Sequence, residues 1–570
     1  MKKTPVRNGG DVLLELFQMK GFDHIFCSPL SVWAPLWEAL ARHRESTGTE
    51  APRYINCRHE VLAVGLASGY YKATGRPQIV LLPTGMGVLN GAMAIRGAYQ
   101  ERVPMIILAP DSFGLGENPH LDPGPEWPYL LSDLGGPVRF TEKIVKWGKE
   151  IKNPRDLISD FMRACYFADI VPRRPTLLSI PFELLMTPMD FALPPDISPQ
   201  PLVTAEASVR SLAETLLQSK NPIVIAEHAC RSREDIDTLT RFSELLGAPV
   251  FEYPYPMYKN FPRTHPLHGS YAGEDILHNA DCILLIGCNA PWHPPLVSLP
   301  ETTKVIILEE DPLRPRAPYW GYKTDVCIAG DIRANLENLC RYIEEAIGES
   351  PGKAEEIAAR DKHWREFNAR NRQPTILSET VPGMVSATSL FRMLAEILPD
   401  NSVIVDEIIA QGMLMMQHLF TKDSFSHYRG AAGGLGTAIP TALGIKLADP
   451  AKPVVCIIGD GSFSYEPVLS CLGCSQQYKL PILIVICNNQ GFASQTWNTR
   501  KYFPEGAAIR TGKFYGDVIE PTPDYGKIAA AFDAYGERVP ESENLRPALE
   551  RGMAAVNAGR LAIIDVTVQP

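Results

Sequence analysis

Two polar clusters in the C-terminal third of the chain could hold a metal ion and a phosphate group. Gly459-Asp460-Gly461 ends one apolar run, and Asn488-Asn489-Gln490-Gly491 ends the next. Neighbouring parallel strands end at the same edge of a sheet, where open α/β folds bind ligands. The glycines let the backbone approach a phosphate, and a following helix offers free N–H groups. Asp460 and Asn489 supply hard oxygen atoms that suit Mg²⁺.

The N-terminal segment contains a second group of candidates, at the start of a predicted helix. Glu60 comes just after the predicted strand RYINC, and His59 directly precedes it. Taken alone, Glu60 is an acidic residue that stabilises a helix N-terminus by a few tenths of a kcal/mol, roughly. His59 is expected to orient its neighbour more than to act as an acid. Ser28 lies in the loop after the first predicted strand. Its position is equally compatible with a role as a substrate contact and with a role as a turn residue.

The elements that must position these residues alternate along the whole chain. Short apolar runs bounded by Gly, Pro or Asp, such as 79–83, 105–110, 282–288 and 454–461, are separated by helix-length amphipathic stretches. Continuous apolar runs predict strands buried on both faces, and their alternation with helices predicts parallel sheets. The sequence therefore predicts an α/β fold of doubly wound parallel-sheet domains.

Two breaks divide the chain into three predicted domains. Residues 181–208 are rich in proline and predict a crossing linker, and residues 348–379 are charged and predict a helix that bridges domains on the surface. We place the domains at residues 1–185, 195–347 and 375–570.

Composition narrows the class of partner. The chain has 570 residues and a net charge of -10, with no basic stripe for a nucleic acid or an anionic membrane. Twelve scattered cysteines, several inside apolar runs, indicate free thiols in a reducing compartment. There is no signal-peptide pattern and no run of 18 apolar residues. We expect a cytoplasmic protein whose partner is a small molecule.

The two clusters resemble a known fingerprint. GDG followed after 26 residues by NN resembles the thiamin-diphosphate-binding motif, and AAGGLGTAIPTALGIKLADP is similar to the same segment of benzoylformate decarboxylase and, less closely, of acetolactate synthase. The chain is identified as a member of the thiamin-diphosphate-dependent enzymes. The resemblance implies a Mg²⁺ site made by Asp460, Asn489 and the carbonyl of Gly491. It also implies several contacts to the cofactor. The carbonyl of Gly433 would accept a hydrogen bond from the aminopyrimidine, and Leu435 would wedge the cofactor into a bent form. Further cofactor contacts would come from Gly459, Gly461, Ser462 and Phe492.

The N-terminal segment CRHEVLAVGLASGYYKATGRPQIVLLPTGMG is similar to the pyrimidine-binding domain of the same family. By that resemblance Glu60 is the catalytic carboxyl group. It would protonate the pyrimidine ring, so that the cofactor's own amine removes the C2 proton and forms an ylid. The three domains then correspond to the family's pyrimidine-binding, central and diphosphate-binding domains.

Glu60 and Asp460 are about 400 residues apart, so the domains that carry them must meet. In the family they meet across two subunits. The resemblance therefore implies a homodimer or a homotetramer with the active site between subunits.

The reaction is less clearly indicated, because the chain departs from three well-known patterns. Pro83 stands where benzoylformate decarboxylase has a histidine, and Phe182 stands where acetolactate synthase has a lysine. Pyruvate decarboxylase has two adjacent histidines and, after NN, a glutamate. In this chain His120 is the one candidate for the histidine pair, and Gln495 takes the place of the glutamate. His120 and Gln495 remain candidates for the substrate pocket.

Three hypotheses follow. The first is a lyase that decarboxylates a 2-oxo acid and protonates the resulting enamine or passes it to an aldehyde. The second is an acetolactate-synthase-type transferase, in which ligation is the main step. The third is a non-catalytic nucleotide-binding protein of the Rossmann type. The family's central domain holds FAD in acetolactate synthase and ADP in oxalyl-CoA decarboxylase, but this chain shows no GxGxxG there.

Overall fold

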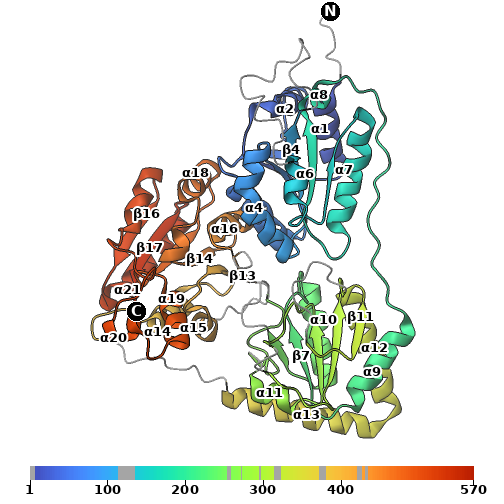
Figure 1. The fold of residues 1–570 in the computed structure, drawn as a ribbon, viewed down its shortest axis with the longest axis vertical. Helices are drawn as coiled ribbons and strands as arrows, with labels where there is room; N and C mark the ends of the chain where they lie inside the picture. The colour runs from blue at the N-terminus through green and yellow to red at the C-terminus, as the bar shows by residue number, and fades with distance from the viewer. Residues whose placement is uncertain are drawn as a thin grey trace, which may run out of the picture.

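The computed structural model describes residues 7–112, 135–252, 259–270, 273–293, 297–312, 322–371, 381–419, 426–430 and 434–569. They form three α/β units, each built on a parallel sheet with helices on both faces, as the alternating pattern predicts (Figure 1). In the described part of the chain, no helix is long and apolar enough to cross a membrane.

The N-terminal unit has a six-stranded sheet in the order β2-β1-β3-β4-β6-β5. Its strands are β1 (His24–Cys27), β2 (Arg53–Asn56), β3 (Ile79–Leu81), β4 (Ile106–Asp111), β5 (Trp147–Glu150) and β6 (Thr176–Pro181). Its helices are α1 (Gly9–Met19), η1 (Ser31–Trp33), α2 (Ala34–Thr47), α3 (Glu60–Thr74), α4 (Gly85–Gln100), α6 (Gly136–Thr141), α7 (Pro154–Asp169) and α8 (Phe182–Met186). The strands β3, β4 and β6 are buried along their whole length, which explains their continuous apolar runs.

The central unit has five parallel strands in the order β11-β10-β9-β7-β8. They are β7 (Pro222–Ala226), β8 (Val250–Glu252), β9 (Cys282–Ile286), β10 (Lys304–Glu309) and β11 (Val326–Ala329), with helices α9 (Glu206–Gln218), α10 (Arg233–Leu246), α11 (Glu274–Asn279), α12 (Ile332–Glu349) and α13 (Pro351–Asn371). The charged helix α13 does more than bridge domains: it buries Ile357 and Trp364 in the core of this unit. Its few apolar residues are enough to fix it there.

The C-terminal unit has six parallel strands in the order β13-β12-β14-β15-β17-β16. They are β12 (Val403–Glu407), β13 (His427–Arg429), β14 (Val454–Gly459), β15 (Leu483–Asn488), β16 (Tyr535–Val539) and β17 (Ala562–Thr567). The helices are α14 (Ala387–Ile397), α15 (Gly412–His418), α16 (Ala438–Ala448), α17 (Asp460–Phe463), α18 (Val468–Tyr478), α19 (Ala493–Tyr502), α20 (Ala507–Thr511), η3 (Tyr525–Phe532), η4 (Ser542–Asn544) and α21 (Leu545–Asn557). As predicted, β14 and β15 are neighbours, so both polar clusters lie at one edge of the sheet.

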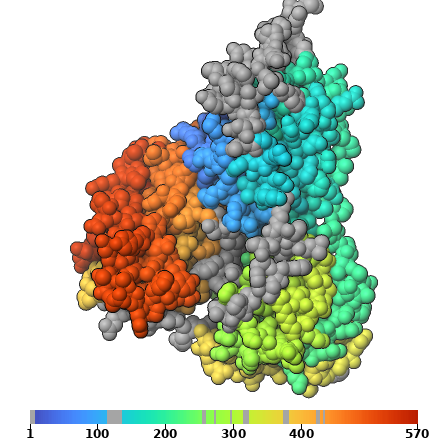
Figure 2. Space-filling view, viewed as in Figure 1, coloured from blue at the N-terminus to red at the C-terminus, as the bar shows by residue number. Residues whose placement is uncertain are grey.

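The N-terminal and C-terminal units pack directly on each other through α3 and α16, and Figure 2 shows their surfaces in contact. A Cβ atom on Gly69 of α3 would lie only 2.0 Å from the carbonyl oxygen of Thr441 in α16. Glycine is therefore required for this close approach. One continuous apolar core includes Leu66 and Ala67 of α3 together with Ala442 and Leu443 of α16.

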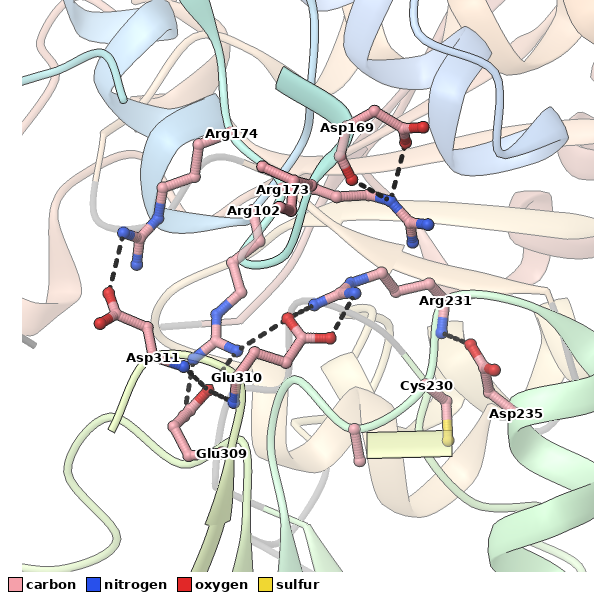
Figure 3. Close-up of polar contacts among 12 residues, drawn as sticks. Arg102, Asp169, Arg173, Arg174, Cys230, Arg231, Asp235, Glu309, Glu310 and Asp311 are labelled. Carbon is pink, nitrogen blue, oxygen red and sulfur yellow. Dashed lines mark hydrogen bonds and ion pairs between the residues drawn. The ribbon is translucent and has the colours of Figure 1, made fainter. Parts of the chain in front are cut away.

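Arginines of the N-terminal unit join it to acidic residues at the carboxyl end of β10 in the central unit (Figure 3). Arg102 donates to both oxygens of Glu309, at 2.7 and 2.8 Å, and both side chains are buried. Arg174 pairs with Asp311 at 3.3 Å. A bidentate pair between planar groups fixes orientation as well as distance, so it sets how the two units meet.

Candidate active site

Asp460 lies at the junction between β14 and the short helix α17, and its side chain is almost completely buried. Burial raises the pKa of Asp460 to about 6, although backbone N–H groups of the same loop oppose the shift. Its Oδ2 atom is buried and has no hydrogen-bond partner. Burying a carboxylate without a partner costs free energy, so a positive charge bound at this site would stabilise it.

The end of β15 brings two further oxygen atoms to Asp460. One terminal atom of the Asn489 side-chain amide lies 2.9 Å from Asp460 Oδ1 and 3.1 Å from the carbonyl oxygen of Gly491. With its nitrogen at this position, the amide donates a hydrogen bond to both atoms. With its oxygen there, Asp460, Asn489 and Gly491 offer three oxygen atoms that a cation would stabilise. Asp460 Oδ2 has no hydrogen-bond partner in either orientation.

Gly491 is held in place by the segment that follows α20. A Cβ atom on Gly491 would lie 1.9 Å from the carbonyl oxygen of Asp517, so no larger residue fits. Phe492 N donates to that same carbonyl at 2.6 Å, and Thr496 Oγ1 donates to Asp517 Oδ2 at 2.8 Å. The sequence analysis did not identify Asp517 or Thr496. No local signal points to them, because their role depends on a contact between distant segments.

The oxygen set fits Mg²⁺ by its chemistry. In the described ranges, no three His, Cys, Asp or Glu side chains gather as a metal site. The Asp460 set has one carboxylate, one amide and one backbone carbonyl, all hard oxygen ligands. Mg²⁺ in proteins commonly keeps further oxygens from water or from a substrate's phosphates. The glycines at positions 459 and 461 leave backbone accessible here, and the ring of Phe492 packs against Gly461.

Glu60 is the first residue of α3, and its carboxylate is held from two sides by the N-terminal unit. Ser28 Oγ donates to Glu60 Oε1 at 3.0 Å. Asn90 Nδ2 of α4 donates to Glu60 Oε2. Ser28 is buried, whereas Asn90 is exposed, so the carboxylate lies at an opening of the unit. The sequence analysis placed Ser28 near the site but missed Asn90, because a single asparagine in a helix gives no signal.

His59 has a structural role that accounts for its position. It is the N-cap of α3, and its Nδ1 atom accepts a hydrogen bond from Val61 N at 3.2 Å. A cap of this kind satisfies one of the free N–H groups of the helix start. His59 therefore fixes the start of α3, and the role in which it orients its neighbour Glu60 stays a prediction.

The remaining candidates divide into three groups. Ser462 is buried directly after Gly461, as a residue near a bound diphosphate would be. Leu435 is half-buried just before α16, and Gln495 lies exposed in α19. His120 and Gly433 lie outside the described residues.

The two halves of the candidate site belong to different units of the chain. The partners of Glu60 described above, Ser28 and Asn90, are both in the N-terminal unit. Large apolar side chains are exposed beside both halves: Met86 and Leu89 near Asn90 in α4, and Tyr465, Leu469 and Trp497 near the clusters of the C-terminal unit. Such surfaces are typical of interfaces.

The central unit presents buried ion pairs at the carboxyl edge of its sheet. Arg231 binds Glu310 next to the Arg102–Glu309 pair (Figure 3). A cavity of about 240 Å³ remains beside Arg231, lined also by Tyr71 and Arg173 of the N-terminal unit.

Family models match all three units in order. The N-terminal thiamine pyrophosphate (TPP) binding domain matches residues 7–113, the central domain matches residues 209–339, and the C-terminal TPP binding domain matches residues 410–566. The chain belongs to the thiamine pyrophosphate enzymes. The family relationship expected from GDG, NN and the Glu60 segment is thereby confirmed, as is the fold class.

Curated relatives span the whole chain at low identity. The benzoylformate decarboxylase of Pseudomonas aeruginosa is 26% identical and covers 91% of this chain and 93% of its own. The acetolactate synthase large subunit of Haemophilus influenzae is 24% identical and covers 100% of this chain and 95% of its own. The chain is thus similar to members of the family with different activities.

Solved structures show the same fold. A thiamine diphosphate-dependent 4-hydroxybenzoylformate decarboxylase from Rhodococcus jostii has a TM-score of 0.79 at 21% identity, with 99% of each chain covered. A thiamin diphosphate-dependent enzyme from Mycobacterium smegmatis has a TM-score of 0.79 at 23% identity, with 99% of this chain and 100% of that chain covered.

Proposed function

We propose that this thiamine pyrophosphate enzyme is a Mg²⁺-dependent lyase that decarboxylates a 2-oxo acid and releases or ligates the resulting fragment. The observation that carries the proposal is that the Asn489 amide lies 2.9 Å from Asp460 Oδ1 and 3.1 Å from the Gly491 carbonyl oxygen. In the proposal these atoms hold Mg²⁺ and, through it, the diphosphate of the cofactor. Gly459, Gly461, Ser462 and Phe492 line the same strand ends and complete the diphosphate site.

When bound, the cofactor supplies a carbon nucleophile that adds to the substrate's carbonyl group. The chain's own contribution is to hold the cofactor and to exchange a proton with it. Glu60 presents a carboxyl group oriented by Ser28 and Asn90, and this group holds the proton that the pyrimidine ring requires. Gly433, Leu435, His120 and Gln495 remain candidates for the pyrimidine and substrate contacts.

We further propose that the site forms between two subunits, in a homodimer or a homotetramer. The exposed apolar side chains Met86, Leu89, Tyr465 and Leu469 support this arrangement, because a second copy would cover them. The units predicted at 1–185, 195–347 and 375–570, the central one extended by α13, would then serve as pyrimidine-binding, central and diphosphate-binding domains. Eleven of the twelve cysteines are buried and all are free, which suits an enzyme of the cytoplasm.

A second candidate function is acetolactate-synthase-type ligation. The observation that favours it is the end-to-end match to acetolactate synthase large subunits. The departures at Pro83, Phe182 and Gln495 set the chain apart from each of the three best-known patterns, so neither reaction is favoured by its characteristic residues.

The experiment combines binding with a substrate panel. Quenching of tryptophan fluorescence is followed as thiamin diphosphate and Mg²⁺ are added to the wild type and to Asp460→Ala. We expect saturable, Mg²⁺-dependent binding in the wild type only. Equal binding in both proteins would overturn the metal assignment.

A panel of 2-oxo acids is then assayed for CO₂ release, with free aldehyde and acetolactate measured separately. Release of aldehyde supports the lyase, and acetolactate from pyruvate supports ligation. If no 2-oxo acid releases CO₂ while the cofactor binds, the decarboxylase proposal is wrong.

A further inference from the structure

Two buried carboxyl groups, Glu407 and Glu466, meet at the N-terminus of α16 and have no role in the site described above. Glu407 is the last residue of β12, and Glu466 follows α17 by three residues. Their side chains are about 3% and 7% exposed. They come from two segments that both lead to the proposed cofactor site.

Glu407 accepts three backbone hydrogen bonds from the start of α16. Its Oε1 atom accepts from Gly436 N at 2.7 Å, and its Oε2 atom accepts from Thr437 N and Ala438 N, each at 3.1 Å. These N–H groups belong to the helix start and have no carbonyl partner within the helix. Glu407 therefore fixes the loop that carries Leu435.

Glu466 accepts two bonds at the same place. Its Oε1 atom accepts from Ala438 N at 2.9 Å and from Ile439 N at 3.2 Å. The Ala438 N–H is thus shared between the two carboxyl groups, which places an oxygen of each around a single hydrogen atom. The Oε2 atom of Glu466 is buried and has no hydrogen-bond partner.

The charges around the pair are unfavourable for two carboxylates. Asp406 beside Glu407, Cys456 of β14 and Cys471 of α18 act on the pair, and none of these three is a cation. The basic groups His427 and Arg429 of β13 pair with Asp406. Burial and mutual repulsion raise the pKa of Glu466 well above its usual range, and burial raises the pKa of Glu407 to about 7. The N-terminus of α16 offers positive potential to both groups, but a partial charge of this size cannot offset two full negative charges.

We propose that Glu407 and Glu466 are positioning residues that share one proton and, in that singly protonated form, fix the loop 434–438 for cofactor binding. This inference rests on the proposed function, because the loop matters only if the cofactor lies against it. The pair joins three segments: the end of β12, the start of α16 and the GDG segment. Tyr465, next to Glu466, also packs against the loop, since its carbonyl oxygen lies 2.4 Å from where a Cβ of Gly436 would be.

The sign of the pH effect follows from the raised pKa. Folding favours the neutral acid, so the pair's contribution to stability is complete below about pH 4.5, the ordinary value for Glu, and is lost as the pH rises through the folded pKa near 7 and above. Glu466→Gln keeps an acceptor for Ala438 and Ile439 but cannot ionise. Its melting temperature should therefore rise relative to the wild type as the pH increases from about 5 to about 8.

The experiment measures the melting temperature of the apo protein over that pH range for the wild type, Glu466→Gln and the exposed control Glu543→Gln. The control should follow the wild type at every pH. The proposal of a shared proton would be wrong if the melting temperature of Glu466→Gln, relative to the wild type, stayed constant or fell as the pH rises.

Cofactor binding tests the positioning role separately. Titration with thiamin diphosphate and Mg²⁺ at pH 7 should show Glu466→Gln within about threefold of the wild type and Glu466→Ala weakened by about tenfold or more, since the bonds to Ala438 and Ile439 are lost. Wild-type affinity in Glu466→Ala would overturn the positioning role. If Glu466→Ala does not fold, Glu466→Leu, which fills the space but accepts no hydrogen bond, replaces it with the same expected loss. The melting series still tests the shared proton.

Failure of this inference can be told apart from failure of the proposed function. If the wild type binds no cofactor, the proposed function is wrong, whatever the melting series shows. If the wild type binds cofactor and Glu466→Ala binds it equally well, only the positioning role is wrong.

Discussion

Ser28 and Glu60 are joined by a hydrogen bond of 3.0 Å from Ser28 Oγ to Glu60 Oε1, and Asn90 holds the other carboxylate oxygen. The two residues reach Glu60 from opposite sides, one from the loop after β1 and one from α4. The carboxylate is thus oriented by residues of its own unit. Preorganisation of this kind is what a proton-transferring group requires.

The first prediction concerns these two hydrogen bonds. Ser28→Ala and Asn90→Ala should each lower kcat by roughly 10- to 150-fold, because one bond to a charged group contributes about 1.5–3 kcal/mol. Cofactor affinity and melting temperature should change little, since neither residue touches the Asp460 cluster in the described contacts. Ser31→Ala, in the same loop but exposed, serves as the matched control. Unchanged kcat in both variants would show that Glu60 needs no such orientation.

The second prediction concerns Gly491. Gly491→Ala places a methyl group where the Asp517 carbonyl oxygen lies only 1.9 Å away, so the backbone must move and the Gly491 carbonyl with it. We expect Mg²⁺-dependent binding of thiamin diphosphate to weaken by about tenfold or more, because one ligand of the metal is displaced. Fluorescence titration measures the change.

Gly273→Ala is the control for Gly491→Ala. It starts α11 in the central unit, and a Cβ there meets nothing within 4 Å. Equal cofactor affinity in Gly491→Ala and the wild type would show that the Gly491 carbonyl is not a ligand of the metal.

Much of this arrangement could be predicted from the sequence, and the reason is local. A strand buried on both faces appears as a continuous apolar run, and GDG and NN each end one such run. The residues that the sequence did not reveal act over long distances. Asn90, Asp517 and Glu466 are ordinary polar residues in their own segments. Their partners are brought to them only by the packing of the folded chain.

The third prediction concerns the ion pair between the N-terminal and central units. Arg102→Ala should lower the free energy of unfolding by about 3–5 kcal/mol, because it removes the cation against which the Glu309 carboxylate is buried. Urea denaturation measures the loss. Arg44→Ala removes an exposed pair with Glu50 and should cost no more than about 1 kcal/mol. Arg102→Met combined with Glu309→Leu should recover most of the stability, and failure of Arg102→Ala to differ from Arg44→Ala would contradict the account.

The fourth prediction concerns the division of the site between subunits. A mixed dimer of one Glu60→Gln subunit and one Asp460→Ala subunit, purified through two different tags, contains one intact site if Glu60 and Asp460 act across the interface. It should release CO₂ at about half the wild-type rate per dimer, whereas each parent homodimer is inactive. No recovery in the mixed dimer would place both residues of one site in a single chain.

The central claim is that Glu60 acts on the cofactor itself. Exchange of the C2 hydrogen of bound thiamin diphosphate in D₂O, stopped with acid and read by proton NMR, tests it without any substrate. In proteins saturated with cofactor and Mg²⁺, Glu60→Gln should exchange this hydrogen about 100-fold or more slowly than the wild type. Equal exchange rates in the two saturated proteins would contradict the claim.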